Sequence, residues 1–383
     1  MLPLDKKKKT VYFFFCNTTY NKKNYLRFNL EDFEEKYILK IVDFTRILFP
    51  SFNQFKQKVF YKKKIWHIEN YQDLTTLYEE LKKNKKNFIV DLSFYADFNK
   101  EFFNNFKYYA TSLKNTISFI FNLGLFREYQ YNFAITKTYL YLKKKIFYFF
   151  KKNITYSYFL VSGTKFLNIV SYKNLIPSQS FDFIKTRKKN YLISKLPKER
   201  YVVFIDTFVG KNTDYFFNKD LNKINLKNYF KSVNYLLHYI KGQLKSKIFL
   251  ATHYKSNINY IKNYKSCDRF FYDKTDELIN KAQYVILTYS TAVSYAIIFN
   301  KPLIYLYLDN NLIIKKRTHT LWKSTGGFRL FENKFLSLNK NDLKVDKNKY
   351  KKYLDSFIKY PGSSNKNFFK LIDEKIRGHS SIK

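Results

Sequence analysis

Residues 284–309 read YVILTYSTAVSYAIIFNKPLIYLYLD and decide between a membrane protein and an α/β fold. The stretch is long and apolar enough to suggest a transmembrane helix, which needs about 20 apolar residues in a row. Asn300, Lys301 and Pro302 interrupt the run, and these residues are costly in hydrocarbon and break a helix. We therefore predict two buried strands of a parallel sheet joined by a helix and an Asn-Lys-Pro turn, with the strands at 284–288 and 302–309 and the helix at 291–300.

The same alternation of strand and helix extends back through the C-terminal half. Apolar runs rich in Val, Ile and Phe predict strands at 201–206, 247–253 and 269–273. Apolar residues at helical spacing predict helices at 226–244 and 274–282. Strands that alternate with helices are typical of a Rossmann-like domain with a parallel sheet.

The N-terminal half shows a similar pattern, and we predict a second α/β domain there. The expected strands cover 11–17, 87–94, 116–123 and 156–163, and the expected helices cover 30–49 and 71–84. The basic and aromatic run at 139–153 is interpreted as a surface helix.

The domain boundaries follow from where this rhythm breaks. Residues 172–200 carry two prolines and many charges, so we predict a linker there. The expected organisation is an acceptor-side α/β domain (1–171), this linker, a nucleotide-donor domain (201–340) and a basic helical tail (341–383). A chain of 383 residues suits two such domains.

The chain is strongly basic, with 71 Lys and Arg against 30 Asp and Glu and a formal charge of +41. Only nine of the basic residues are Arg, while Lys, Asn, Ile, Phe and Tyr are abundant throughout, as in proteins of AT-rich genomes. A reader of phosphates or bases would use more Arg, so we predict no nucleic-acid partner. A Lys-rich surface favours anionic lipid headgroups and anionic substrates.

The cysteines and the N-terminus favour a cytoplasmic protein. Cys16 and Cys267 are too few for a disulfide framework, and no CxxC motif is present. The N-terminus MLPLDKKKKTVYFFFC has too short an apolar run for a signal peptide. We expect a cytoplasmic location, with the protein peripheral on the inner face of the membrane.

Hydroxyl residues stand between the strand and the helix of the first stretch. Ser290 and Thr291 follow the carboxyl end of a predicted parallel strand, where α/β sheets bind ligands. Helix N-termini favour anions, typically phosphate, and the two hydroxyls add donors. The alternative is that Ser290 only caps the helix.

Two further strand ends carry chemistry. FLATHYKSN places His253 and Lys255 after one strand, and VVFIDTFVG places Asp206 after another. An imidazole can hold or protonate a departing phosphate, and a carboxylate can act as a general base. The set suits transfer from a phosphate-linked donor to a hydroxyl, with Asp206 deprotonating the acceptor.

At these residues a resemblance to known enzymes is visible. The stretch from Asp273 to Asp309 resembles the donor-nucleotide half of bacterial GT-B glycosyltransferases, and the order of acidic, His and Ser-Thr motifs is similar to bacterial sialyltransferases that use CMP-activated sugars. The resemblance implies a GT-B fold, two Rossmann-like domains facing a cleft. It also implies Asp206 as the catalytic base and a cytidine-nucleotide site that includes His253, Ser290 and Thr291. We expect Lys255 and, at the start of the helix in KTDELINKA, Thr275 to belong to the same donor phosphate site.

The sequence departs from the sialyltransferase pattern in two places. Tyr254, and not Pro, follows His253, and IDTFVG lacks the second acid, so Asp214 is an alternative base. The stretch also resembles teichoic-acid-type transferases that use CDP-activated polyols, although Thr288 stands where their signature has Asp.

We therefore expect a glycosyltransferase that moves a sugar from a CMP-linked donor to a bacterial surface glycan or glycolipid. It would need no metal or other cofactor, since no DxD motif ends a strand and no His or Cys cluster has ligand spacing. The alternatives are a CDP-polyol phosphotransferase and a non-enzymatic basic protein that binds membranes or nucleic acid.

Overall fold

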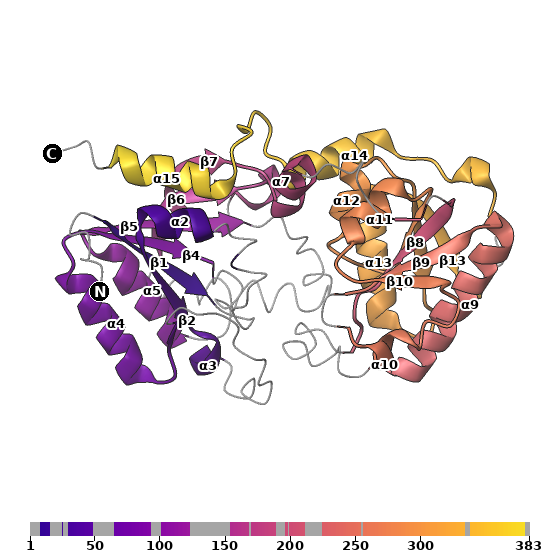
Figure 1. Cartoon of the computed structure of the whole chain (residues 1–383), viewed down its shortest axis with the longest axis horizontal. Helices are drawn as coiled ribbons and strands as arrows, with labels where there is room; N and C mark the ends of the chain where they lie inside the picture. Colours follow the sequence, from indigo (N-terminus) through magenta and orange to yellow (C-terminus); the bar gives the residue numbers. More distant parts are fainter. Residues whose placement is uncertain are drawn as a thin grey trace, which may run out of the picture. The chain divides into compact units, whose positions relative to one another are not determined.

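The structure is a computed structural model with two compact units (Figure 1). Among the described residues, the first unit takes those up to Phe181 and those from Tyr360 onward, and the second takes Asp182–Lys359. The described residues are 8–15, 25, 30–48, 65–92, 101–122, 154–167, 170–188, 196–197, 199–210, 224–253, 256–333 and 338–379.

The first unit is built on a parallel sheet with the strand order β3-β2-β1-β4-β5-β6-β7. The strands are β1 (Thr10–Phe15), β2 (Ile38–Asp43), β3 (Trp66–His67), β4 (Asn87–Asp91), β5 (Thr116–Asn122), β6 (Thr155–Val161) and β7 (Ser171–Pro177). The helices are α2 (Leu30–Lys36), α3 (Thr45–Leu48), α4 (Tyr71–Lys83), α5 (Glu101–Ser112), η4 (Thr164–Phe166), α7 (Phe181–Lys188, divided between the units) and α15 (Phe368–Gly378).

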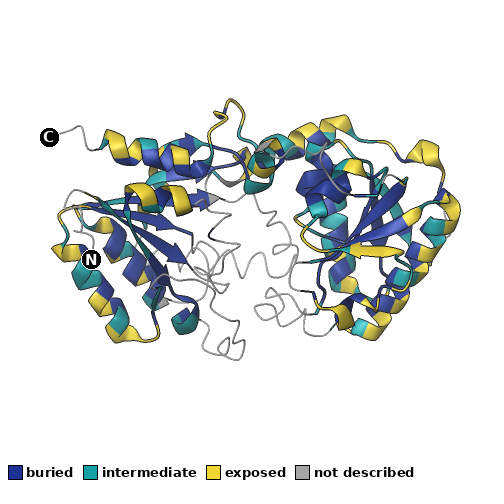
Figure 2. Cartoon of the chain, in the orientation of Figure 1, coloured by how far each residue is buried: buried dark blue, intermediate teal, exposed yellow. Residues whose placement is uncertain are grey.

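Helices cover both faces of this sheet, which explains why β1 is buried from Val11 onward (Figure 2). Successive side chains of a strand point to opposite faces. Tyr12 and Phe14 belong to a core cluster that includes residues of α4 and α5. Phe13 packs between Phe33 of α2 and Phe369 of α15, with ring centroids 5.7 and 6.2 Å away.

The helix expected over 30–49 is wrong in its second half. The structure has α2, then strand β2, then the short helix α3 in this range. The β-branched run ILKIVD pairs with β1 over six residues, from Ile38 opposite Thr10 to Asp43 opposite Phe15. Pairing in the centre of the sheet outweighs the local helical spacing.

The linker expected over 172–200 also needs correction. Its first part is β7, which pairs with β6, and α7 follows. The polar sequence that suggested a linker belongs to the outermost strand of the sheet, where residues from Ser171 to Leu175 are exposed or partly exposed. Pro177 is tolerated at the end of such an edge strand.

The tail expected over 341–383 divides between the two units. Helix α14 (Lys347–Tyr353) and the π-helix η8 (Leu354–Ile358) belong to the second unit, and α15 belongs to the first. Asp373 of α15 accepts a hydrogen bond from the Tyr37 hydroxyl at 2.6 Å and pairs with Lys36 at 3.1 Å. The last described helix therefore completes the first domain.

The second unit has a parallel sheet with the order β10-β9-β8-β11-β12-β13. The strands are β8 (Tyr201–Ile205), β9 (Lys247–Ala251), β10 (Arg269–Phe271), β11 (Val285–Leu287), β12 (Leu303–Tyr307) and β13 (Phe328–Phe331). The helices are α9 (Leu226–Leu244), α10 (Ile258–Ile261), α11 (Thr275–Lys281), α12 (Val293–Ile298), α13 (Leu312–Thr325), η7 (Lys340–Asp342), α14 and η8.

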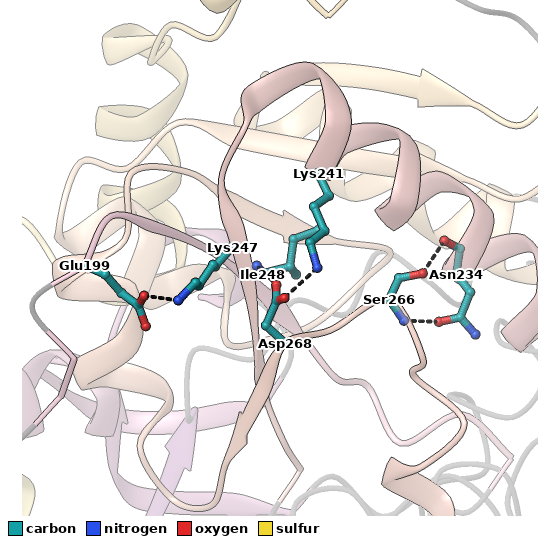
Figure 3. Close-up of polar contacts among 7 residues, drawn as sticks. All are labelled: Glu199, Asn234, Lys241, Lys247, Ile248, Ser266 and Asp268. Atoms are coloured by element: carbon teal, nitrogen blue, oxygen red, sulfur yellow. Dashed lines mark hydrogen bonds and ion pairs between the residues drawn. The ribbon is translucent and has the colours of Figure 1, made fainter.

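Polar contacts hold the amino end of β9 and the start of β10 in place (Figure 3). Asp268 accepts from the backbone N–H of Ile248 at 2.8 Å and from the Nζ of Lys241 at 2.5 Å. Lys247 is paired with Glu199. These contacts, and those of Ser266 with Asn234 of α9, fix the strand that carries His253 at its other end (Figure 3).

Residues 284–309 form β11, α12 and β12, as predicted, although each element is shorter than expected. Asn300 adopts a left-handed φ of 54°, and the Lys301 N–H donates to the carbonyl of Ala296 at 2.8 Å, so the Asn-Lys-Pro segment is a turn. Across the described ranges, no helix has the length and apolar character of a membrane span.

Candidate functional site

The sheet of the second domain has one point where the chain reverses its direction of growth. From β8 the chain adds β9 and β10 on one side and then β11, β12 and β13 on the other. Ligands of open parallel sheets bind outside the carboxyl ends of the strands at such a switch point. Here Asp206 and Thr207 follow β8, and Thr288, Tyr289 and Ser290 follow β11.

Asp206 is buried and serves as the centre of a hydrogen-bond network. Its Oδ1 accepts from the backbone N–H of Phe208 at 2.7 Å and from the Tyr264 hydroxyl at 2.8 Å. Its Oδ2 accepts from the backbone N–H of His253 at 3.3 Å and from the Ser256 hydroxyl at 2.9 Å. Burial raises the pKa of Asp206, and the four hydrogen bonds act in the opposite direction.

This geometry gives Asp206 a positioning role. A carboxylate has about four acceptor positions, and four donors of the domain itself use them. A general base needs a position within reach of the substrate proton. In the structure Asp206 therefore positions the loops after β8 and β9, and the catalytic role that the sequence predicts for it stays a prediction.

His253 is held by ring stacking as well as by its backbone. The imidazole lies on the ring of Phe208, with centroids 5.1 Å apart and an angle of 6° between the planes. Phe208 adopts a left-handed φ of 52°, which is unfavourable for a bulky residue and must be stabilised by its surroundings. The hydrogen bond from its N–H to Asp206 supplies part of that stabilisation.

Three buried tyrosines lie next to this hydrogen-bond network. Tyr229, Tyr260 and Tyr264 are buried, and Phe230 packs edge-on against Tyr260 and Tyr264. Burial and the charge of Asp206 raise the pKa of all three tyrosines. Their hydroxyls therefore stay protonated at neutral pH, and the hydroxyl of Tyr264 donates to the carboxylate of Asp206.

Buried hydroxyls without a well-formed hydrogen bond lie at the same switch point. Thr288 is fully buried, and its hydroxyl has no hydrogen-bond partner among the described residues. The hydroxyls of Thr207 and Tyr229 lie near each other without the geometry of a hydrogen bond. Buried polar groups are nearly always satisfied, and exceptions concentrate where a function or a ligand accounts for them.

Ser290 and Thr291 lie in the loop before α12, and the helix begins two residues later than the sequence suggests. The hydroxyl oxygen of Ser290 accepts from the Ala292 N–H at 3.2 Å, which leaves its hydrogen available to another acceptor. With six residues, α12 is too short for a strong helix dipole. An anion at this loop would therefore have to be held by hydroxyls and side chains.

The segment expected to be a linker contributes to this region through α7. Asp182 accepts a hydrogen bond from the Ser294 hydroxyl at 2.5 Å. Lys185 pairs with the buried Asp276 of α11 at 2.9 Å, and its Nζ lies 5.8 Å from the centroid of the Tyr295 ring in α12. Helices α11 and α12 thus lie side by side, and Thr275 opens the first of them.

Of the predicted site residues, the structure brings Asp206 and His253 together and places Ser290 and Thr291 at the switch point. Lys255 and the alternative base Asp214 lie outside the described residues. In the described ranges, no group of three or more His, Cys, Asp and Glu side chains is arranged to hold a metal ion.

The sequence analysis missed a histidine–aspartate pair in the first domain. Asp43 ends β2, and His67 ends the neighbouring β3. Asp43 Oδ1 accepts from both the N–H and the hydroxyl of Thr45, while Oδ2 lies 3.2 Å from His67 Nδ1. The second contact has the distance of an ion pair but not the angle of a hydrogen bond. The sequence analysis missed this pair because it predicted one helix over 30–49, where the structure has strand β2.

A buried charge pair was missed in the same domain. Lys107 of α5 is fully buried, and its Nζ lies 3.2 Å from Oδ2 of Asp91, the last residue of β4. The same oxygen accepts from the Tyr156 hydroxyl at 2.6 Å. Lysine is almost never fully buried unless it is paired, so we assign this ion pair to the structural stability of the first domain.

Comparison with known proteins supports the fold. No family model matches the chain, and no curated protein sequence matches it. The wall teichoic acid polymerase TagF, in its H548A variant, is similar in structure, with a TM-score of 0.50 and 14% identity over 98% of this chain and 90% of that chain. CalG4, the calicheamicin glycosyltransferase, shows a TM-score of 0.47, 9% identity and coverage of 98% and 99%. MurG of Acinetobacter baumannii has a TM-score of 0.44 and 9% identity, over 96% of this chain and 99% of that chain.

The likeness to TagF, together with the two parallel sheets, identifies a two-domain Rossmann-like fold of the GT-B type. This confirms the fold class that the sequence predicts.

Proposed function

We propose that this chain is a nucleotide-sugar-dependent glycosyltransferase whose second domain binds the donor. The observation that carries the proposal is the switch point between β8 and β11, where the stacked His253, the loop hydroxyls of Ser290 and Thr291 and the buried Thr207 and Thr288 hydroxyls gather. Donors at the carboxyl edge of a parallel sheet suit a phosphate-linked ligand.

The donor in this proposal is a CMP-linked sugar. The order of the acidic, His and Ser-Thr motifs along the chain supports a cytidine nucleotide, through the resemblance described above. His253 holds the departing phosphate, and the hydroxyls of Ser290 and Thr291 donate to its oxygens. Thr275 and Lys255 remain proposed members of the same donor site.

The acceptor is a hydroxyl of a bacterial surface glycan, such as lipooligosaccharide or capsule. In the transfer, a base removes the hydroxyl proton, the oxygen bonds to the anomeric carbon and the bond from that carbon to the phosphate oxygen breaks, releasing CMP. Because the acceptor positions of Asp206 are occupied, the alternative acid of the sequence analysis, Asp214, is the base in this proposal. We place the protein in the cytoplasm, with its lysines drawing it to the anionic inner leaflet.

A CDP-polyol phosphotransferase is the second candidate. The turn TYST and the following Lys301-Pro302 strand resemble that class, although Thr288 replaces the expected Asp. Both reactions release CMP, so the product decides between them. A phosphodiester adds phosphorus to the acceptor, and a glycoside does not.

A thermal-shift screen with CMP, CDP, UDP and GDP tests the donor site. A ligand that binds only the folded state raises the melting temperature with its concentration. We expect shifts with the cytidine nucleotides. No shift with any nucleotide would remove the donor-site proposal, and a shift with UDP alone would remove the cytidine part.

The non-enzymatic alternative makes different predictions. A basic binding protein would bind generic DNA or RNA with a strong dependence on salt and would keep its function in His253→Ala. We expect instead that His253→Ala loses the shift with CMP. Retained nucleotide binding in that variant would contradict the assigned role of His253.

A further inference from the structure

A pocket lies between α2 and α15 in the first domain. The two helices lie side by side on the sheet, and their Phe33 and Phe369 rings pack with centroids 5.4 Å apart (Figure 1). Both rings form part of the pocket wall, and the cavity has a volume of about 270 Å³. Sites for drug-sized ligands usually have about 300–1,000 Å³, so this pocket suits a smaller group.

The charged residues that line the pocket carry a positive surplus. Lys36 comes from α2, and Lys370 and Arg377 come from α15. The two carboxylates of the lining are Asp32 and Asp373. The lining is therefore basic, even though it contains two acids.

Asp373 holds two of these cations at one oxygen. It is buried, and its Oδ2 lies 3.1 Å from Lys36 Nζ and 2.9 Å from Arg377 Nη2. The side chains of Lys36 and Arg377 are still 52% and 64% exposed. One carboxylate thus fixes two cations beside the pocket, and their combined charge exceeds its own.

We propose that this pocket binds a phosphate ester, at a site distinct from the donor site of the second domain. Ammonium and guanidinium groups form strong, charge-assisted hydrogen bonds to phosphate oxygens, and arginine can donate two in parallel. Lys370 forms no ion pair among the residues that the structure describes, so its charge adds to the attraction for the ligand. The phosphate is either that of a small ester in solution or that of a phospholipid headgroup.

The last turn of α15, which also carries the arginine of the pocket, is surrounded by further positive charge. Lys9 Nζ donates to the carbonyl of Ile376 at 3.2 Å, and Lys86 Nζ donates to that of His379 at 2.6 Å. Burial lowers the pKa of His379, and the charges of Lys86, Lys375 and Lys9 lower it further. Such a concentration of one sign of charge draws anions to this side of the domain.

The alternative is that these charges only hold α15 on the first domain. In that case, removing Arg377 lowers stability, and removing Lys370 changes nothing, because it forms no ion pair there. A phosphate site predicts that both residues contribute to anion binding. Lys370 is the sharper test, since its removal leaves the contacts of Asp373 intact.

The first experiment measures binding of inorganic phosphate and glycerol 3-phosphate to the full chain by calorimetry at constant ionic strength. We expect Lys370→Ala and Arg377→Gln each to lower the affinity about 5- to 20-fold. Lys352→Ala removes an exposed lysine of α14 in the second domain and should bind as the wild type does. Melting curves show whether each variant is folded.

The second experiment uses vesicles of phosphatidylcholine and phosphatidylglycerol in equal parts, with vesicles of phosphatidylcholine alone as the comparison. Cosedimentation measures the bound fraction of the same three variants. A loss in Lys370→Ala and Arg377→Gln with the soluble ligands alone identifies a free phosphate ester. A loss with the mixed vesicles identifies the phospholipid headgroup.

The inference is overturned if Lys370→Ala and Arg377→Gln match Lys352→Ala with both the soluble ligands and the vesicles. Inorganic phosphate can also enter the donor site, so the loss in the α15 variants, and not binding itself, decides the outcome. Binding of CMP should be unchanged in these variants. A failure of the donor site would therefore leave this inference standing, and the reverse also holds.

Discussion

The rings of Phe208 and His253 lie flat against each other, with centroids 5.1 Å apart and planes 6° from parallel. Both residues also donate a backbone N–H to the same carboxylate, that of Asp206. Asp206 thus fixes the loops after the neighbouring strands β8 and β9, and the stack on Phe208 holds the His253 imidazole in place.

Replacing Phe208 tests the stack. Phe208→Ala removes the ring that stacks on His253, while the unfavourable left-handed backbone at this position remains. We therefore expect CMP affinity to fall about 5- to 20-fold and the free energy of unfolding to fall by about 2–4 kcal/mol. The NMR signal of the His253 imidazole should shift downfield as the ring current disappears. Phe208→Tyr keeps the stack and should bind CMP normally, and weak binding by this variant would contradict the account.

Replacing Asp206 separates positioning from proton transfer. In Asp206→Asn an amide N–H₂ faces donors that now have no acceptor, which should cost about 1–3 kcal/mol of stability and weaken CMP binding. The residual activity should keep the wild-type pH profile, because the base is elsewhere. A variant with full CMP affinity and no measurable turnover would restore Asp206 as the base.

The buried pair of Lys107 and Asp91 predicts a large cost for removing one partner. Lys107→Ala leaves a carboxylate buried beside Tyr156, so we expect a loss of about 3–5 kcal/mol in the free energy of unfolding. The double variant Lys107→Met with Asp91→Asn should be more stable than Lys107→Ala, because it leaves no buried charge. Urea unfolding followed by circular dichroism gives both values, and equal stabilities would contradict the account.

The contact of α15 with the first domain should weaken in acid. Burial raises the pKa of Asp373, but hydrogen bonds from Tyr37 and Lys36 and the charges of Lys36 and Arg377 outweigh it and lower the pKa below the usual value. A lowered folded-state pKa stabilises the protein above the unfolded-state pKa, and this stability is lost as pH falls through the folded-state value.

We therefore expect Asp373→Asn to cost about 1–2 kcal/mol at pH 7 and progressively less below about pH 4. Unfolding curves at several pH values measure the difference. Glu31→Gln, on the exposed side of α2, is the control and should show no such dependence. A constant difference between Asp373→Asn and the wild type at all pH values would contradict the linkage.

Local sequence was sufficient where one pattern dominated. The helix expected at 226–244 is α9 with the same bounds, because a continuous apolar stripe covers it and Asn225 caps its start. The strand within 30–49 was missed because pairing with β1 is a long-range effect that helical spacing conceals. The edge strand β7 was missed because a half-exposed strand carries linker-like polar residues.

The candidate site was predictable in location and less so in roles. Strand ends followed by polar residues correctly placed His253 and Ser290 at the carboxyl edge. The role of Asp206 depends on Tyr264 and Ser256, which lie 58 and 50 positions away along the chain. Sequence spacing does not show such long-range contacts.

The position of α15 in the first domain also has a consequence for biosynthesis. During translation, the ribosome exposes residues Asp182–Lys359 before the segment that carries Phe369. The second domain can therefore fold first, while the face of the first sheet around Phe13 and Phe33 is not yet covered by α15. Nascent chains stalled before Tyr360 should expose that aromatic surface to chaperones, even though all seven strands of the sheet have already been synthesised.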